Sequence, residues 1–350
     1  MLSGTLKIKT QGNAARNRIM ETMKYFVIES KGRGLGSSRD AVRSPVSRRQ
    51  LKESDLRRTV LFFVALALMG CSDNKQTGVA TGRSLGANSS IGNGTVSSYA
   101  EFDQTGVPRA IGIVFQASAL DGLPTAHSDG HHCFDRNKDG KVDPQTECFA
   151  SHEWVIPLPS EAARRSEIPF KWVGLNWNPH GHIPPGVYDL PHFDVHFYID
   201  PIEKVFAVEP GPCGPEFVRC DQFELATKPL PPNYMNPDFK NVGAVAPAMG
   251  NHLIDQTSPE FNGKKFTRTW IYGVYDGRVT FYEEMVTRDY LLSQPTTCFP
   301  LKSPPAVGIR GYYPTQSCIR YLSQANEYSV SMEGFALREA SAPEPITAVE

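Results

Sequence analysis

Residues 268–286 read RTWIYGVYDGRVTFYEEMV, two runs of β-branched and aromatic residues on either side of an Asp-Gly pair. Asp-Gly between two apolar runs is the strongest short-range signal for a β-hairpin. The stretch therefore predicts two antiparallel strands that turn at Asp276 and Gly277. Because several other segments of the body share this composition, the hairpin is typical of the expected fold class.

Five further segments have the same β-branched and aromatic character, and they are 110–116, 153–159, 170–177, 193–199 and 327–335. Helical periodicity is scarce, and only residues 118–124 and 159–165 are candidates for short helices. Many strands, long Pro-rich connections and one or two short helices predict a mostly β protein. We expect a single large domain, either a β-sandwich or a barrel.

The N-terminal part of the chain has the features of an export signal. Arg57 and Arg58 precede the apolar run TVLFFVALALMGC, which ends at Cys71. About a dozen apolar residues are too few to span a membrane, which takes roughly 20, and fit the apolar region of a signal peptide. The run resembles the lipobox of bacterial lipoproteins, in which the cysteine is diacylated. Ser72 after that cysteine is compatible, by analogy with lipoproteins, with sorting to the outer membrane.

Residues 1–70 are therefore expected to be an N-terminal extension and a signal peptide. The mature protein would be lipid-anchored in the bacterial cell envelope, facing the periplasm or the cell surface. A short transmembrane anchor or an unrelated buried cysteine are the alternatives. Residues 71–98 are rich in Gly, Ser, Asn and Thr and predict a flexible tether. The β-rich body would span 99–337, and 338–350 would be a disordered tail.

Charge and cysteine content agree with export. Residues 1–70 contain 14 of the 36 Lys and Arg but only 5 of the 37 Asp and Glu, so the mature part is acidic, which argues against a nucleic-acid partner. Without Cys71, six cysteines remain, and they persist as disulfides only in an oxidising compartment. Fifteen connectivities are conceivable. Nearest-neighbour pairing is the preferred one, and it joins Cys133 to Cys148, Cys213 to Cys220 and Cys298 to Cys318.

Residues 175–200 read LNWNPHGHIPPGVYDLPHFDVHFYID. This segment resembles a family of exported bacterial proteins, a domain of unknown function, that shares the signature G-H-x-P-x-G-x-Y-D-x-P-H-F-D-x-H-F-Y. The signature is matched by residues 181–198, and segments 242–255 and 270–287 are also similar to the family. The resemblance covers most of the body and implies a mostly β fold and export, but it implies no activity. The insert at 126–152 departs from the family pattern.

The strand within that signature predicts one polar face. Alternate side chains of a strand share a face, so His192, Asp194 and His196 would lie together on a solvated face, opposite a buried apolar face. His192 and His196 would be about 13 Å apart, too far to share one ion unless the strand bends. Further candidate ligands lie elsewhere in the sequence, and they are His180, His182, His252, Glu283 and Glu284.

Two interpretations of these residues stay open. Three or four of them could converge on zinc or another transition metal, with neutral imidazoles and one carboxylate. Alternatively, they form a hydrogen-bonded polar network that stabilises the core. Glu283 and Glu284 point to opposite faces of a strand and are expected to be surface or network residues.

The insert contains a sequence typical of a calcium-binding loop. Oxygen-bearing side chains follow the spacing of such loops, with a glycine at the sharp turn and a backbone carbonyl from Lys141 at position 7. Val142 is expected to pack inward. The expected calcium ligands are Asp135, Asn137, Asp139, Lys141, Asp143 and Glu147. Glu147 lies one residue later than the usual position, and the alternative is a solvated acidic turn closed by the flanking cysteines.

No sequence pattern for nucleophilic catalysis is found, so the leading hypothesis is not an enzyme. We expect a binding or structural module of the envelope with a structural calcium loop, whose partner is a small molecule or another envelope protein. The alternative is a metal-dependent enzyme that uses the face of His192, Asp194 and His196, with His182 or His252 completing the ligands. Homo-oligomerisation is a further expectation.

Overall fold

The Asp-Gly hairpin forms as the sequence predicts. In the computed structural model, which describes residues 82–341, β11 (Arg268–Tyr275) pairs antiparallel with β12 (Arg278–Thr287). Asp276 and Gly277 between them have φ of 49° and 69°, as the tight hairpin turn requires. This hairpin lies inside a seven-stranded sheet with the order β5-β6-β7-β12-β11-β10-β9.

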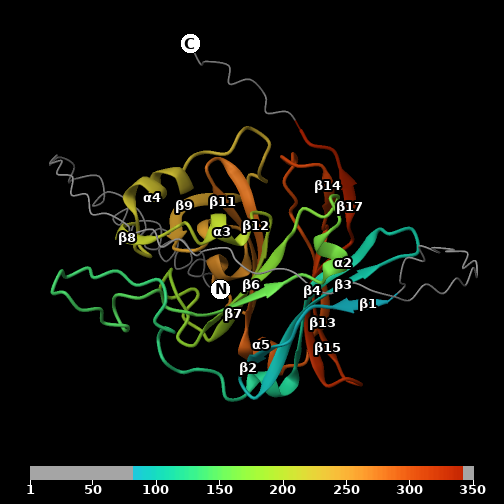
Figure 1. Ribbon diagram of the computed structural model, residues 1–350, viewed down its shortest axis with the longest axis horizontal. Helices are drawn as coiled ribbons and strands as arrows, with labels where there is room; N and C mark the ends of the chain where they lie inside the picture. Colours follow the sequence, from blue (N-terminus) through green and yellow to red (C-terminus); the bar gives the residue numbers. More distant parts are fainter. Residues whose placement is uncertain (1–81, 342–350) are drawn as a thin grey trace, which may run out of the picture. The chain divides into compact units, whose positions relative to one another are not determined.

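This sheet is called the second sheet below. It is antiparallel throughout, and Figure 1 shows its strands in green to orange. Its other strands are β5 (His152–Pro157), β6 (Trp172–Asn178), β7 (His192–Tyr198), β9 (Phe239–Ala246) and β10 (Gly250–Asp255). The first sheet also has seven strands, in the order β1-β3-β4-β16-β15-β13 with β2 paired to β3. These strands are β1 (Arg83–Leu85), β2 (Ser89–Ile91), β3 (Gly94–Phe102), β4 (Pro108–Gln116), β13 (Thr296–Pro300), β15 (Gln316–Leu322) and β16 (Glu327–Glu333).

The two sheets pack face to face as a sandwich, which confirms the predicted mostly β class. One core cluster takes side chains from both sheets, and the rings of Phe115 on β4 and Phe193 on β7 lie 6.0 Å apart between their centroids. A polar contact also joins the sheets, because the Ser317 hydroxyl donates to Glu284 at 2.6 Å. Glu284 therefore lies inside the sandwich and not at the surface, where one interpretation of the sequence expected it.

Short elements occupy the connections between strands. The predicted helical segments appear as η1 (Ala117–Leu120) and α2 (Ser160–Ala163). The other elements are α3 (Ile202–Val205), β8 (Pro210–Cys213), α4 (Cys220–Ala226), η2 (Pro259–Asn262), α5 (Arg288–Leu292), β14 (Gly311–Tyr313) and β17 (Ala336–Arg338). Figure 1 shows α3 and α4 on the side of the second sheet that faces away from the first. Within residues 82–341, no helix has the length and apolar character that crossing a membrane requires.

The boundaries of the body differ from those expected. The predicted tether was 71–98, but residues 83–98 contribute to β1, β2 and β3. Ile91 and Val96 are buried in the core, and pairing with neighbouring strands supplies the backbone hydrogen bonds that a small-residue segment needs. In the described part of the predicted tail, Arg338 donates to the carbonyl of Pro304 at 2.7 Å. The predicted signal peptide, Cys71 and residues 342–350 lie outside the described residues.

Candidate functional site

The predicted polar face of β7 exists, but it is not solvated. His192, Asp194 and His196 point to one side of the second sheet, and their exposed fractions are 0%, 4% and 0%. Every residue of β7 is buried, including the apolar set on the opposite side. The expectation that one face of this strand is wet is therefore wrong.

Connections packed on the outer side of the second sheet account for this burial. The Pro-rich connection after β6 contributes Val187 and Tyr188, which pack with Met285 of β12. The end of the insert contributes Phe149, and the segment after β7 contributes Val205 of α3, both in a cluster with β-sheet residues. These covering segments are irregular, so strand periodicity alone does not reveal them.

Three groups of described side chains could hold a metal ion, and His182, His192 and Asp194 form one of them (first group). Another consists of Cys298, Cys318 and Glu333, but its two cysteines are bonded to each other as a disulfide. Nε2 of His192 lies 3.1 Å from Oδ1 of Asp194, and Nε2 of His182 lies 3.4 Å from Oδ2. The two imidazole centroids are 4.7 Å apart. Asn178 on β6 also donates from Nδ2 to Asp194 Oδ2 at 2.7 Å.

The second nitrogen of each imidazole determines what the first group can do. His192 Nδ1 contacts the Leu190 carbonyl at 2.6 Å, and His182 Nδ1 contacts the Ile183 carbonyl at 2.7 Å. A carbonyl oxygen only accepts, so Nδ1 carries the proton, and the Nε2 of a neutral ring presents a lone pair. Both lone pairs then face Asp194, and neither His192 Nε2 nor Asp194 Oδ1 has a hydrogen-bond partner. The group requires protons or a cation between these acceptors.

Burial and charge act in opposite directions on the first group. Burial alone would raise the pKa of Asp194, but the imidazoles of His192 and His182 outweigh it and hold that pKa well below its usual value. Burial opposes protonation of His182, yet the carboxylate of Asp194 raises the pKa of His182 overall. Asp194 therefore stays ionised and favours a positive charge beside it.

His196, His252 and Glu283 form the second group. Nε2 of His196 lies 3.6 Å from Glu283 Oε1, and Nε2 of His252 lies 3.7 Å from Oε2. His192 and His196 thus belong to different groups, as their predicted separation requires. His252 joins His196 and not the first group, and Glu283 is a buried partner with 1% exposure, not a surface residue.

Burial dominates the acid-base properties of the second group. It lowers the pKa of His196 to about 3 and that of His252 to about 4, so both imidazoles are neutral near pH 7. Burial also raises the pKa of Glu283 well above its usual value, and the nearby charges of Asp194 and Glu284 act in the same direction. Two neutral imidazoles beside a carboxyl group are a ligand set that zinc accepts.

A cavity of about 40 Å³ adjoins both groups, since His182 and Asp194 of the first and His252 of the second line it. This exceeds the about 10–15 Å³ that one water molecule needs. Most of the remaining wall is apolar, but Glu216 also reaches it from the loop between Cys213 and Cys220. Burial raises the pKa of Glu216. No sequence signal except its place in a cysteine-bounded loop could have identified this residue.

The insert folds into a loop whose acidic side chains accept hydrogen bonds from the loop's own amides. The Asp135 carboxylate accepts from the amides of Lys138 (2.7 Å) and Gly140 (3.0 Å). Glu147 is buried, and its carboxylate accepts from three loop amides, those of Arg136, Asn137 and Asp143. These amides lower the pKa of Glu147.

The loop does not gather its carboxylates as tightly as the histidine groups gather theirs. Among the described residues, the groups that could hold a metal ion include none of the loop acids. The acidic side chains instead accept from amides of the loop, as Asp139 does from Lys141 and Asp143 from Gln145. Val142 is 45% exposed, so the expectation that it packs inward is wrong.

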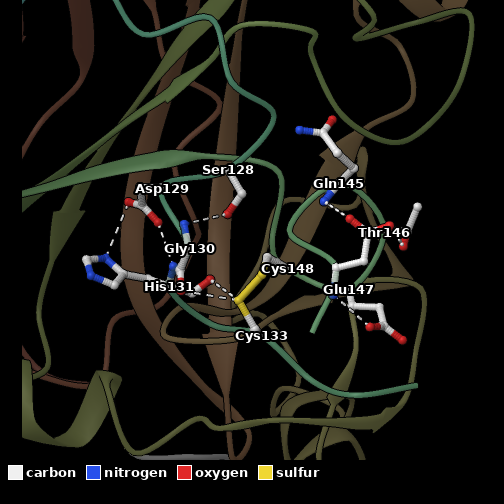
Figure 2. Close-up of a disulfide and its surroundings, with 10 residues drawn as sticks. Ser128, Asp129, Gly130, His131, Cys133, Gln145, Thr146, Glu147 and Cys148 are labelled. Atoms are coloured by element: carbon white, nitrogen blue, oxygen red, sulfur yellow. Dashed lines mark hydrogen bonds and ion pairs between the residues drawn. A yellow bond between two sulfur atoms is a disulfide. The ribbon is translucent and has the colours of Figure 1, made fainter. Parts of the chain in front are cut away.

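All three predicted disulfides are present. Cys133 bonds Cys148, Cys213 bonds Cys220 and Cys298 bonds Cys318. Figure 2 shows the first of these bonds, which joins the two ends of the insert loop. The other candidate ligand, His180, contacts the Thr125 carbonyl and belongs to neither histidine group.

Comparison of the chain with protein-family models, with curated proteins and with solved structures found no match. The resemblance to the exported family therefore stays a prediction. The chemistry of the two buried groups is the firmest basis for a functional hypothesis.

Proposed function

We propose that this chain is a lipid-anchored envelope protein whose body binds a transition-metal ion, such as zinc, through His182, His192 and Asp194. One observation carries the proposal: two imidazole Nε2 atoms face one buried carboxylate while their Nδ1 atoms are held by backbone carbonyls. Metal-bound histidines characteristically donate their other ring nitrogen to a carbonyl or a carboxylate. A single cation would satisfy all three acceptors.

The distances in the first group support the same interpretation. Zinc bonds of about 2.0–2.1 Å in a tetrahedral arrangement place neighbouring ligand atoms about 3.3–3.4 Å apart. The measured contacts of 3.1 and 3.4 Å lie close to that spacing. The three disulfides fit an oxidising environment and leave no free thiol among the six cysteines of the body. The ligands available to a metal ion there are therefore histidines and carboxylates.

Metal analysis of the purified full-length protein tests this proposal. We expect His182→Gln to lower the zinc content by one ion per chain relative to the wild type after equilibration with zinc. His180→Ala is the matched control, because His180 is a nearby histidine outside both groups, and it should leave the zinc content unchanged. Equal zinc content in wild type and His182→Gln would contradict the proposal.

A second candidate function is a metal-dependent enzyme on the same face. The cavity beside the first group favours it, since three protein ligands with an open fourth position are typical of catalytic zinc sites. Azide added to the cobalt-loaded protein should shift its visible absorption if the cavity offers that open position. An unchanged spectrum would leave the binding module as the supported function.

The insert loop is proposed to bind calcium weakly as a structural ion. Asp135 and Glu147 accept hydrogen bonds from amides of the loop, and these bonds hold the acidic loop in a compact turn around Gly140. The lipid anchor at Cys71 and a small-molecule or envelope-protein partner belong to the same proposal and rest on the sequence.

A further inference from the structure

The second group combines burial with unsatisfied polar atoms. His196 and Glu283 are buried in the outer face of the second sheet, on β7 and β12, which pair at these two residues. His196 Nε2 and Glu283 Oε2 have no hydrogen-bond partner. Such atoms are rare inside proteins, and each one calls for a ligand, a water molecule or an ion.

We propose that His196, His252 and Glu283 bind a second divalent cation, at a site separate from the one in the first group. The proposal goes beyond the first site and does not require that site to be occupied. The chemical class of the ion follows from the ligands, because two imidazoles and one carboxylate suit zinc, cobalt(II) or a similar transition metal better than calcium or magnesium.

The separations within the group are too long for hydrogen bonds and suitable for a shared ion. The donor and acceptor atoms of an N–H···O hydrogen bond are about 2.7–3.2 Å apart. Here the Nε2 atoms of His196 and His252 lie 3.6 and 3.7 Å from the nearest carboxylate oxygen of Glu283. Tetrahedral zinc bonds of about 2.0–2.1 Å separate neighbouring ligand atoms by about 3.3–3.4 Å, so a small inward shift of these side chains would bring them onto one ion. His252 Nδ1 contacts the Ala244 carbonyl at 2.9 Å, which leaves Nε2 free to bind the ion.

An aromatic ring fixes these distances. The Phe281 centroid lies 5.1 Å from that of His196 and 5.1 Å from that of His252, so one ring supports both imidazoles. Gly273 on β11 makes room for this ring, since a Cβ there would lie 1.9 Å from a Phe281 ring carbon. The spacing of the ligands is therefore set by packing, and the imidazoles cannot simply collapse onto the carboxylate.

Charge gives an independent argument. The ion pairs of Glu283 within the described chain are with His196 and His252, and neither Lys nor Arg contributes. Glu284, the next residue, differs because it pairs with Arg268 on the opposite face. A buried carboxylate without a basic partner is unfavourable, and a bound cation would offset its desolvation.

Two separate ions fit this geometry better than a bridged pair. Asp194 and His196 are two residues apart on one strand, which corresponds to roughly 6.6 Å. Bridged two-metal centres have ions about 3.5–4 Å apart. His252 nevertheless lines the same cavity as His182 and Asp194, so this one cavity has room for a water ligand beside each ion.

Metal stoichiometry in a set of variants tests the proposal. The full-length protein would be stripped with a chelator, equilibrated with zinc and analysed by mass spectrometry. We expect two ions in the wild type, one in Glu283→Gln, one in Asp194→Asn and none in the double variant. His180→Ala should keep both ions. His252→Gln should also retain one ion, and it is a second test if Glu283→Gln does not fold, because the side chain of His252 is partly exposed.

The outcomes separate this proposal from the proposed function. One ion in the wild type that only Asp194→Asn removes would overturn the second site and leave the first intact. One ion that only Glu283→Gln or His252→Gln removes would support the second site and overturn the first. Two ions in both Glu283→Gln and His252→Gln, or no zinc in the wild type, would overturn the second site.

Discussion

Asp194→Asn distinguishes a metal site from a polar network, because it changes the charge of the first group and keeps its shape. Asp194 faces His182 and His192 and accepts from Asn178. In the metal-free protein, His192 and His182 hold the pKa of Asp194 low, so the ionised carboxylate already stabilises the fold. We therefore expect Asp194→Asn to lose some stability in the presence of a chelator and to lose more in the presence of zinc.

Zinc should separate the two proteins. An ion at 1,000 times its Kd stabilises the folded state by about 4.1 kcal/mol. In a domain of this size, each 1 kcal/mol shifts the melting temperature by about 2–4 °C. The ion in the first group should therefore raise the melting temperature of the wild type by about 8–16 °C relative to chelator. Asp194→Asn should lose this contribution and keep the shift that the second group provides.

A polar network that binds no metal predicts an equal loss of stability with chelator and with zinc. If His182 and His192 are imidazolium ions paired with Asp194, removing the carboxylate breaks a buried charge pair, which costs about 3–5 kcal/mol with or without zinc. Thermal unfolding by calorimetry, with chelator or with zinc, decides between the two. A large loss of stability in the chelator, together with no effect of zinc on the wild type, would refute the metal site.

Four other predictions concern different parts of the chain. Gly273→Ala should destabilise the body by about 1–3 kcal/mol in denaturant titrations, because the added Cβ would clash with the ring of Phe281. Gly308→Ala should leave the stability unchanged, because the atom nearest to its added Cβ, on Tyr234, is 3.8 Å away. Phe197→Ala should cost about 3–5 kcal/mol in the same assay, as truncations of buried aromatic residues do. Calcium should bind the insert with a Kd of about 0.1–1 mM in calorimetry, and Asp139→Ala should abolish the heat; a silent wild type would make the loop an acidic turn. Cys71→Ser should leave an unprocessed precursor in cell fractionation, and a soluble, uncleaved wild type would contradict the anchor.

The sequence predicts the strands well and their environment poorly. The Asp276-Gly277 turn and the buried apolar side of β7 are both confirmed. They could be predicted because both depend on local composition alone. The burial of His192 and His196 could not be predicted, because it depends on loops that are distant in sequence. Periodicity shows that a strand has two different faces, but it does not show what covers the second face.

The candidate site was predicted in its residues but not in its grouping. His182, His192 and Asp194 lie within one signature, and their proximity in sequence matches their proximity in space. Glu283 lies beside His196 only because β12 pairs with β7 in a particular register, and this register cannot be predicted from the sequence pattern. The insert loop shows the reverse case, since its local turns are predictable from the sequence but its ability to bind an ion is not.

The residues of the second group come from β7, β10 and β12, and this determines whether an ion can bind before or only after the chain has folded. The three ligands are far apart along the chain, so they meet only after these strands have assembled, and closing such long loops is entropically unfavourable for an ion in the unfolded chain. The ion would thus be loaded after folding and would not nucleate it, unlike in zinc fingers. If the protein is exported before it folds, the metal supply outside the cytoplasm would decide which ion it carries.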